Sequence, residues 1–331
     1  MTPDRWTLAI EGGEIDPPSG PVLVMRARGD ADFSALGEVT CVQGFKPDHD
    51  RLAARGLTVM VEPEGQFDAA LIQIVKSRAA TYSAIAEAMG HLPPGALVMV
   101  DGQKEEGIEA IVKTLRLVFE VEGVMSKSHG KLAWFRRPDV LPQQVLDWVM
   151  APVPTPEGYL TVQGGFSVDG PDRGSELLVA LLPQLTGRVA DWGAGWGYIS
   201  GEVLDEQEGI ETLDLIEADH AMLDCAEMNV DDPRASFHWA DATKFAPDAP
   251  YDAILCNPPF HVGRRADPSL GRAFIAAAAK ALAPRGRFFM VANRHLPYED
   301  TLKACFGTGR LFGELEGYKI YEAAKPKRTK R

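Results

Sequence analysis

A glycine-rich turn in the second half of the chain has the spacing of a ligand-binding loop. Residues 191–197 read DWGAGWG, after an apolar segment and before a predicted helix. Because they lack a Cβ atom, Gly193, Gly195 and Gly197 let a ligand approach the backbone, and the helix start offers free N–H donors. Tyr198 stands where a dinucleotide-binding Gly-x-Gly-x-x-Gly loop has its third glycine. The turn therefore has the Gly-x-Gly-x-Gly form and departs from that of dehydrogenases.

Acidic residues close consecutive predicted strands around this loop. Asp191 ends the strand before the loop, and Glu217 ends the next strand, twenty residues after Gly197. Glu217 can accept both hydroxyls of a ribose, and Asp241, after the third strand, can meet the exocyclic amine of an adenine. Taken singly, such acids are more often strand-end caps. Since ligands bind at the carboxyl edge of such a sheet, these acids and Ala242 form a predicted nucleoside-binding set.

The most specific motif is Asn257-Pro258-Pro259-Phe260, at the end of the fourth predicted strand. The prolines fix the backbone and remove two N–H donors, so carbonyl oxygens point outward beside the Asn257 side-chain oxygen. Such a site accepts hydrogen bonds from a planar amino group. Two acceptors that hold the hydrogens of such a nitrogen aim its lone pair at an electrophile such as a sulfonium methyl group. They also favour pyramidalisation of the nitrogen. We predict that Asn257, Pro258 and Phe260 are catalytic, and that Asn257 also contacts the cofactor.

The residues after this motif extend the predicted substrate site. Phe260 can stack on a flat base. His261 follows directly, and for it a structural hydrogen bond and a substrate contact fit the sequence equally well. Arg264 and Arg265 form a cationic pair that can meet phosphates, with a solvated surface as the alternative.

Predicted strands place these residues at one edge of a sheet. Short apolar runs alternate with helical stretches, which is the pattern of an α/β fold with a parallel sheet and crossover helices. The predicted strands of the second half are 189–191, 213–217, 236–239, 253–256 and 287–291. Its notable predicted helices are 221–229 and 273–282.

The first half resembles a degenerate copy of the second. Residues 67–73 match residues 251–257, and each segment is followed by a predicted helix, a Pro/Gly turn and a strand. Residues 73–76 read QIVK where the second half has NPPF, and the glycine cluster is reduced to Gly29. We predict two tandem Rossmann-like domains, the first without cofactor. A chance similarity of two α/β segments is the alternative.

Length and proline content place the domain boundary. The 331 residues exceed the roughly 150 of a typical domain. Pro152, Pro154 and Pro156 cannot continue a helix and indicate a linker, so we predict domains at 1–151 and 152–331.

Composition excludes several protein classes. With 45% hydrophobic and 24% charged residues and no apolar run of about 18, the chain has no predicted membrane span or signal peptide. We expect a cytoplasmic monomer. Four cysteines without a Cys-x-x-Cys pair predict reduced thiols and no metal site. The net charge of −13 argues against non-specific nucleic-acid coating, although local cationic patches lie at 127–137, 264–265 and 325–331.

Residues 155–322 resemble the class I methyltransferases that modify guanine N2 in ribosomal RNA, and most resemble the small-subunit 16S enzymes. The resemblance rests on the glycine loop and on four further segments, 166–175 (FSVDGPDRGS), 257–261 (NPPFH), 291–298 (VANRHLPY) and 317–321 (GYKIY). A weaker match in the first half rests on 92–95 and 128–131. That family is built from two related domains, the first without cofactor, which agrees with the degenerate repeat.

The resemblance implies two tandem class I methyltransferase domains that use S-adenosylmethionine and act on ribosomal RNA or a ribosomal subunit. It implies that the glycine loop and Glu217 bind the cofactor and that Asp241 contacts the adenine. Asn257 and Phe260 would hold the target base. Bulky Trp192 and Trp196 depart from the small residues usual in the loop, so we expect the pocket to differ in shape from that of the family.

Alternative functions keep the same fold. A large-subunit guanine-N2 methyltransferase also fits residues 291–296. Protein glutamine N5 and DNA adenine N6 methyltransferases use related Pro-Pro-Tyr motifs, from which Phe260 and His261 depart. A catalytically idle RNA-binding assembly factor is the non-enzymatic alternative, but the intact glycine loop and Asn257 argue against it.

Overall fold

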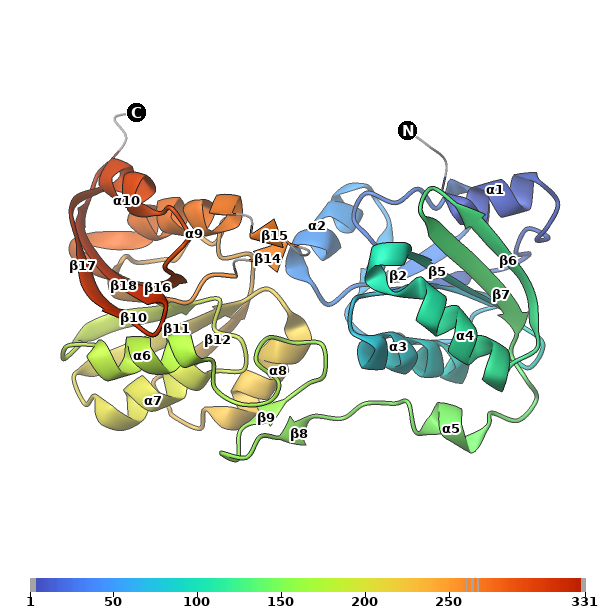
Figure 1. The fold of residues 1–331 in the computed structure, drawn as a ribbon, viewed down its shortest axis with the longest axis horizontal. Helices are drawn as coiled ribbons and strands as arrows, with labels where there is room; N and C mark the ends of the chain where they lie inside the picture. The colour runs from blue at the N-terminus through green and yellow to red at the C-terminus, as the bar shows by residue number, and fades with distance from the viewer. Residues whose placement is uncertain (1–3, 260, 263–264, 267, 329–331) are drawn as a thin grey trace. The chain divides into compact units, whose positions relative to one another are not determined.

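The chain folds into two compact units, Met1–Ala151 and Pro152–Arg331. The computed structural model describes residues 4–259, 261–262, 265–266 and 268–328. Each unit contains one seven-stranded mixed sheet with helices on both faces (Figure 1).

The first unit has the strand order β3-β2-β1-β4-β5-β7-β6, and β7 runs antiparallel to both of its neighbours. Its strands are β1 (Val22–Met25), β2 (Val39–Val42), β3 (Thr58–Met60), β4 (Ala69–Gln73), β5 (Leu97–Gln103), β6 (Val121–Lys127) and β7 (Gly130–Arg136). Its helices are α1 (Arg5–Glu11), α2 (Lys46–Ala54), α3 (Arg78–Gly90), α4 (Ile108–Val118) and α5 (Gln143–Leu146), with short 3-10 turns at Ser34–Leu36 and Lys104–Glu106.

The second unit has the order β12-β11-β10-β13-β16-β18-β17, and here β18 is antiparallel to both of its neighbours. Its sheet consists of β10 (Gly187–Trp192), β11 (Ile210–Glu217), β12 (Ala235–Trp239), β13 (Tyr251–Cys256), β16 (Leu282–Asn293), β17 (Phe306–Leu315) and β18 (Tyr318–Pro326). Its helices are α6 (Arg173–Leu181), α7 (Tyr198–Glu206), α8 (His220–Asn229), α9 (Pro268–Ala281) and α10 (Glu299–Cys305). Two small antiparallel pairs are β8 (Val153–Pro154) with β9 (Leu160–Thr161), and β14 (His261–Val262) with β15 (Arg265–Ala266).

The two sheets have the same topology. Numbered in chain order within each unit, the strands of both sheets follow the order 3-2-1-4-5-7-6. This match confirms the α/β fold and the internal repeat, and excludes a chance similarity of two short segments. It also makes β4 the counterpart of β13, as the alignment of residues 67–73 with 251–257 predicts.

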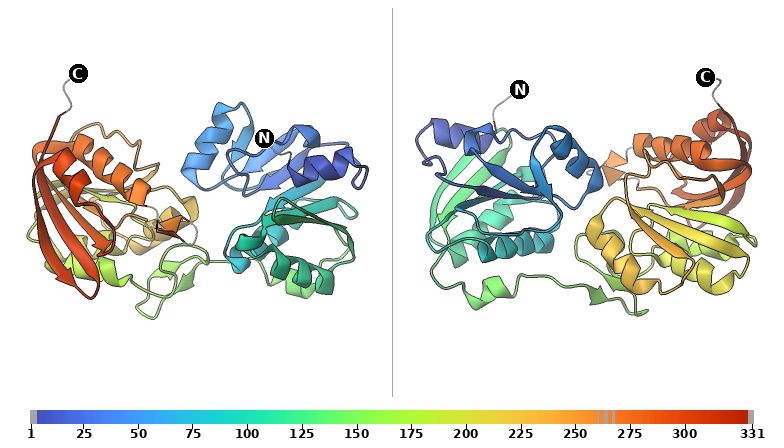
Figure 2. Two further views of the ribbon diagram at one scale, coloured as in Figure 1. Left: turned by 45° about the horizontal axis from the view of Figure 1, so that its top comes forward. Right: turned by 180° about the vertical axis from the view of Figure 1, so that it is seen from behind.

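Burial on both faces explains the apolar runs that predicted these strands. Along β13, Ala253 and Leu255 belong to one core cluster, whereas Ile254 and Cys256 belong to the other. Helices α6 and α7 cover the first face, and α9 and α10 cover the second (Figures 1 and 2). Strands buried on both faces carry near-continuous apolar sequence, which is the signal that predicted them. Each predicted strand of the second half therefore lies within the bounds of an observed strand.

The last two strands of each sheet were not predicted. Strand β17 is mostly exposed and contains three glycines, so it has neither an apolar run nor clear alternation. The predicted helix 273–282 is wrong at both ends, because α9 begins at Pro268 and Leu282 already belongs to β16. Leu282 pairs with Tyr251 beside a register shift, and this extension of the ladder has no local signal.

A buried ion pair links α1 to the sheet of the first unit. The Arg5 Nη2 atom lies 2.8 Å from Asp101 Oδ2, and the two side chains are 6% and 2% exposed. Burial raises the pKa of the Asp101 carboxyl, and the hydrogen bond from Arg5 opposes that rise.

We predict that Arg5→Ala lowers the free energy of unfolding of the first unit by about 3–5 kcal/mol, because the Asp101 carboxylate would stay buried without a partner. The matched control is Arg136→Ala, which removes an exposed pair with Glu122 and should cost under about 1 kcal/mol. Urea unfolding of both variants checks this. Equal midpoints for the two variants would contradict it.

Candidate active site

The glycine loop turns sharply against the end of β11. The backbone N–H groups of Gly193 and Ala194 both donate to the Ile216 carbonyl, at 2.9 and 3.2 Å. Gly195 has φ +57° and Gly197 has φ +91°, a region that side chains with a Cβ rarely adopt. A Cβ on Gly197 would also lie 2.9 Å from Val230, so this glycine lets the start of α7 pack against the end of α8.

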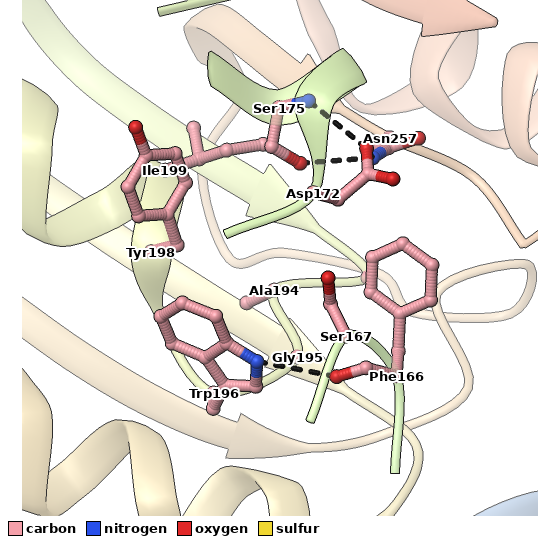
Figure 3. A pocket seen from close by; sticks show the side chains of 11 residues that line it. Phe166, Ser167, Asp172, Ser175, Ala194, Gly195, Trp196, Tyr198, Ile199 and Asn257 are labelled. Carbon is pink, nitrogen blue, oxygen red and sulfur yellow. Dashed lines mark hydrogen bonds between the residues drawn. The ribbon is translucent and has the colours of Figure 1, made fainter. Parts of the chain in front are cut away.

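A pocket opens between this loop, the start of α6 and the end of β13 (Figure 3). It brings together the predicted residues Gly193, Gly195 and Asn257. The other lining residues are Phe166, Ser167, Asp172, Ser175, Ala194, Trp196, Tyr198 and Ile199. Glycine, amide and aromatic groups in one hollow suit a nucleoside and a flat acceptor.

The Asn257 side chain has a fixed orientation. Its Nδ2 donates to Asp172 Oδ2 at 2.9 Å and to Ser175 Oγ at 2.8 Å. The carboxylate accepts hydrogen bonds only, so the amide must turn its nitrogen toward it. Both amide hydrogens are then committed, and among the described residues Oδ1 accepts no hydrogen bond.

Asp172 is itself held in place by the start of α6. It is the N-cap residue, and its Oδ2 accepts the backbone N–H of Ser175 at 3.1 Å. One carboxylate oxygen therefore closes the helix and orients Asn257. Asp172 and Ser175 were absent from the predicted site, although their Asp-x-x-Ser spacing before an apolar run is typical of a helix start.

Glu217 braces the glycine loop. Its Oε2 accepts the Gly195 N–H at 2.8 Å, and its Oε1 accepts the N–H groups of Ala218 and Asp219 at 2.7 and 2.8 Å. Burial raises the pKa of this carboxyl, and the hydrogen bonds from the backbone oppose the rise. A carboxylate oxygen can accept more than one hydrogen bond, so Oε2 keeps capacity for a ribose hydroxyl.

Asp191 lies behind the loop and does not line the pocket. Its side chain is fully buried, and Oδ2 accepts the Ser200 hydroxyl at 2.8 Å. Oδ1 has no hydrogen-bond partner within the described part of the chain. Burial, together with the nearby Glu217 carboxylate, raises the pKa of Asp191 to about 7. Its geometry is that of a support for the loop.

Asp241 and Ala242 follow β12 and also lie outside the pocket lining. Asp241 accepts the backbone N–H and the hydroxyl of Thr243 at 2.9 and 2.6 Å, and Lys244 Nζ lies 3.2 Å from its other oxygen. Ala242 is buried. Asp241 thus caps a turn after β12, which is the structural alternative that the sequence left open for it.

The two tryptophans of the loop do not crowd the glycines. Trp192 is fully buried in the core beneath the sheet edge. Trp196 is 3% exposed, packs against Met222 and Cys225, and donates from Nε1 to the Phe166 carbonyl at 3.2 Å. It therefore forms a wall of the pocket and holds the segment that contains Phe166 (Figure 3).

The predicted catalytic and substrate residues around Asn257 differ in how far the structure describes them. Pro258, predicted to be catalytic, is buried directly after Asn257. Phe260 and Arg264 lie outside the described residues. His261 and Arg265 lie in β14 and β15, whose backbones pair His261 with Ala266 and Val262 with Arg265.

The corresponding sheet edge of the first unit is filled by its own side chains. Gln73, at the end of β4, accepts the Arg28 backbone N–H at 2.7 Å. The Arg28 guanidinium then donates to both Glu106 carboxylate oxygens at 2.8 Å and to the Ile74 carbonyl at 3.3 Å. Polar groups that bind ligand in an open site are here bonded to one another.

Over the described residues, no group of His, Cys, Asp or Glu side chains could hold a metal ion. Among these same residues, no helix has both the length and the apolar character that a bilayer span needs. The four cysteines form no disulfide with one another, and three of them are buried.

Comparison with known proteins places the second unit in a methyltransferase family. The model of the methyltransferase small domain matches residues 158–322. The ribosomal RNA small subunit methyltransferase C of Shewanella oneidensis is 34% identical over 239 residues, which cover 70% of this chain and 69% of that protein. The protein of the same name from Shewanella halifaxensis is 29% identical and covers 92% of this chain and 94% of its own length.

A solved structure has the same two-domain fold. It is the T. thermophilus 16S rRNA N2-guanine methyltransferase, in complex with AdoMet and guanosine. It superimposes with a TM-score of 0.80 at 21% identity and covers 97% of this chain and 92% of its own. With the identity and coverage of the Shewanella relatives, the chain belongs to the ribosomal RNA small subunit methyltransferase C family, as the residues of its second half predict.

Proposed function

We propose that this protein transfers a methyl group from S-adenosylmethionine to the exocyclic N2 of a guanine in 16S ribosomal RNA. The observation that carries the proposal is the Asn257 amide beside the glycine loop, since its nitrogen is engaged by Asp172 and Ser175 while its oxygen has no hydrogen-bond partner in the described part of the chain. The names of the Shewanella relatives and the AdoMet and guanosine in the T. thermophilus complex support the same reaction.

The residues at the loop fit the cofactor. Gly193 and Gly195 leave room against the backbone, since a Cβ there would meet its nearest neighbour only at 3.4 and 3.9 Å. We assign the loop and Glu217 to cofactor binding, with Asp191 as a support behind the loop. Asp241 and Ala242 lie outside the pocket lining, and we propose that they contact the adenine, since a carboxylate oxygen that caps a turn can accept a further hydrogen bond. Bound S-adenosylmethionine supplies an electrophilic sulfonium methyl group.

The chain itself orients the nucleophile. Asn257 Oδ1 and the Pro258 carbonyl accept the two hydrogens of the guanine amino group, which directs its lone pair toward the methyl group. Phe260 stacks on the extruded base, and His261, Arg264 and Arg265 border the RNA. A rotated Asn257 would turn its oxygen against the Asp172 carboxylate, so Asp172 and Ser175 are positioning residues.

One chain supplies both the loop and Asn257, so a monomer suffices for activity. A cytoplasmic location follows from a ribosomal substrate. The large-subunit, protein glutamine and DNA adenine alternatives lack a counterpart among the named relatives. An assembly factor without activity would not need the orientation of Asn257.

The direct experiment is transfer of labelled methyl groups to 16S and 23S rRNA and to 30S and 50S particles from cells that lack the modification. Label should enter guanine N2 of 16S rRNA, free or in the 30S particle. Label in 23S rRNA, or in protein or DNA alone, would contradict the proposal.

We predict one S-adenosylmethionine per chain by calorimetry, because the first unit fills its own sheet edge with Arg28 and Gln73. Gly195→Val should abolish all binding, since a β-branched residue is strained at φ +57° and fills the space beside the loop. A second binding event that survives this substitution would show that the first unit is also active.

Asn257→Ala should keep cofactor affinity within a few-fold and lower the single-turnover rate by on the order of 100-fold or more, because one preorganised acceptor is lost. Calorimetry and single-turnover transfer to 16S rRNA separate the two effects. A near-normal rate would show that Asn257 does not hold the acceptor.

Asp172→Ser should lower kcat on the order of tenfold with little change in thermal stability. Serine also caps a helix, but its short side chain does not reach Asn257. Asp172→Asn is the matched control, because its amide oxygen can accept from both Ser175 and Asn257 and should retain most activity. Equal losses in both variants would instead assign the effect to the charge of Asp172.

A further inference from the structure

We propose that the groove between α4 and the β6–β7 hairpin of the first unit binds backbone phosphates of the substrate RNA. This inference rests on the proposed function, because it takes RNA as the substrate. In the first unit, the sheet edge that corresponds to the glycine-loop site is occupied by Arg28 and Gln73, and the groove gives this unit a binding role of its own.

The groove consists of two adjoining hollows that share Glu109 and Lys131. Helix α4 lies alongside the hairpin (Figure 1). Five cationic side chains line the hollows, against the single carboxylate of Glu109, and these are Lys104, Lys113, Arg116, Lys127 and Lys131. In a chain of net charge −13, this is a local reversal of sign. Clustered cations of this kind attract a polyanion.

Most of these cations are available to a ligand. Within the described part of the chain, Lys113, Arg116 and Lys127 form no ion pair, and Lys131 donates to the neutral Ser126 hydroxyl at 2.9 Å. Lys104 lies 3.8 Å from Glu109 in an exposed pair, which is worth little in water.

The cations of the predicted patch 127–137 therefore fall into two groups, one that faces the groove and one that is bonded within the protein. Lys127 and Lys131 face the groove. Arg136 is paired with Glu122, and the Arg137 guanidinium donates to the carbonyls of Met89 and Pro138 at 3.0 and 2.7 Å. The two arginines are held by the protein itself, so they are poor candidates for phosphate contacts.

The two walls of the groove are joined to each other and to the core of the unit. Ser128 and His129 adopt φ +50° and +57°, as a tight hairpin turn requires. The His129 carbonyl accepts the Lys104 N–H at 2.8 Å, which ties the hairpin tip to the segment before α4. Ile108, Ile111 and Leu115 anchor α4 in the core. The backbone positions that carry the cations are thus set before binding, which leaves only their side chains to be ordered.

Charge favours RNA over a protein partner, although Leu117 at the rim is 81% exposed and would suit an apolar contact. The test compares Lys113→Gln/Arg116→Gln with the control Lys76→Gln/Arg78→Gln. The control pair is also one lysine and one arginine, exposed and without an ion pair in the described structure. Glutamine is a good helix former, so both variants should fold.

Binding of naked 16S rRNA is measured as a function of salt. The groove variant should bind roughly tenfold more weakly at low salt, and the slope of log affinity against log salt should fall by about 1–2, since each lost phosphate contact contributes roughly 0.7–0.9. The control should keep the wild-type slope. An unchanged slope in the groove variant, or an equal fall in the control, overturns the proposal.

Leu117→Ser separates RNA from a protein partner. If Leu117→Ser and the groove variant both lose 30S binding while naked rRNA binds with the wild-type slope, the occupant is a ribosomal protein and the proposal is overturned. Methyl transfer by the wild-type protein is scored in parallel. Groove-dependent RNA binding without transfer of label would support the groove and contradict the proposed function.

Discussion

The Asn257 amide must point one way, and the fold provides this constraint with a single carboxylate. Asp172 Oδ2 accepts from the helix α6 backbone and from Asn257 at once. An acceptor-only group beside an amide decides which end of the amide faces it. The free acceptor at the pocket therefore depends on a helix cap 85 residues away in the chain.

Sheet topology brings these distant residues together. Strand β10 lies between β11 and β13, so the loop after β10 faces Glu217 on one side and Asn257 on the other. Helix α6, which carries Asp172, directly precedes β10 in the chain. Glu217 fixes the loop through Gly195, and Asp172 fixes Asn257. The glycine loop and Asn257 are thus each held by a carboxylate on another element.

The first unit has the same sheet topology but a different set of contacts at the corresponding strand ends. Its glutamine at the equivalent strand end accepts from Arg28, whose side chain spans to Glu106. The polar groups of that edge satisfy one another. The surface of this unit instead carries lysine and arginine side chains in the groove between α4 and the β6–β7 hairpin.

Sequence patterns predicted the parts of this structure that depend on local chemistry. Central strands, the glycine loop and the proline motif each have a local signal, because burial on both faces, positive φ and lost N–H donors restrict residue type. The missed strands β6 and β17 are partly exposed edge strands, whose mixed composition carries no such signal. Their neighbours β7 and β18 were also missed, although β7 is largely buried. The contact of Asp172 with Asn257 and the burial of Trp192 depend on tertiary packing, which spacing alone does not encode.

The central claim is that Asp172 acts on methyl transfer through Asn257. A double-mutant cycle of Asp172→Ser and Asn257→Ala, read as the single-turnover rate on 16S rRNA, tests it most directly. If the claim is right, the double variant is no slower than Asn257→Ala alone, because the amide that Asp172 orients is already gone. The claim would be contradicted if the two losses multiplied, that is, if Asp172→Ser slowed the single-turnover rate of the Asn257→Ala variant by the same factor as that of the wild type.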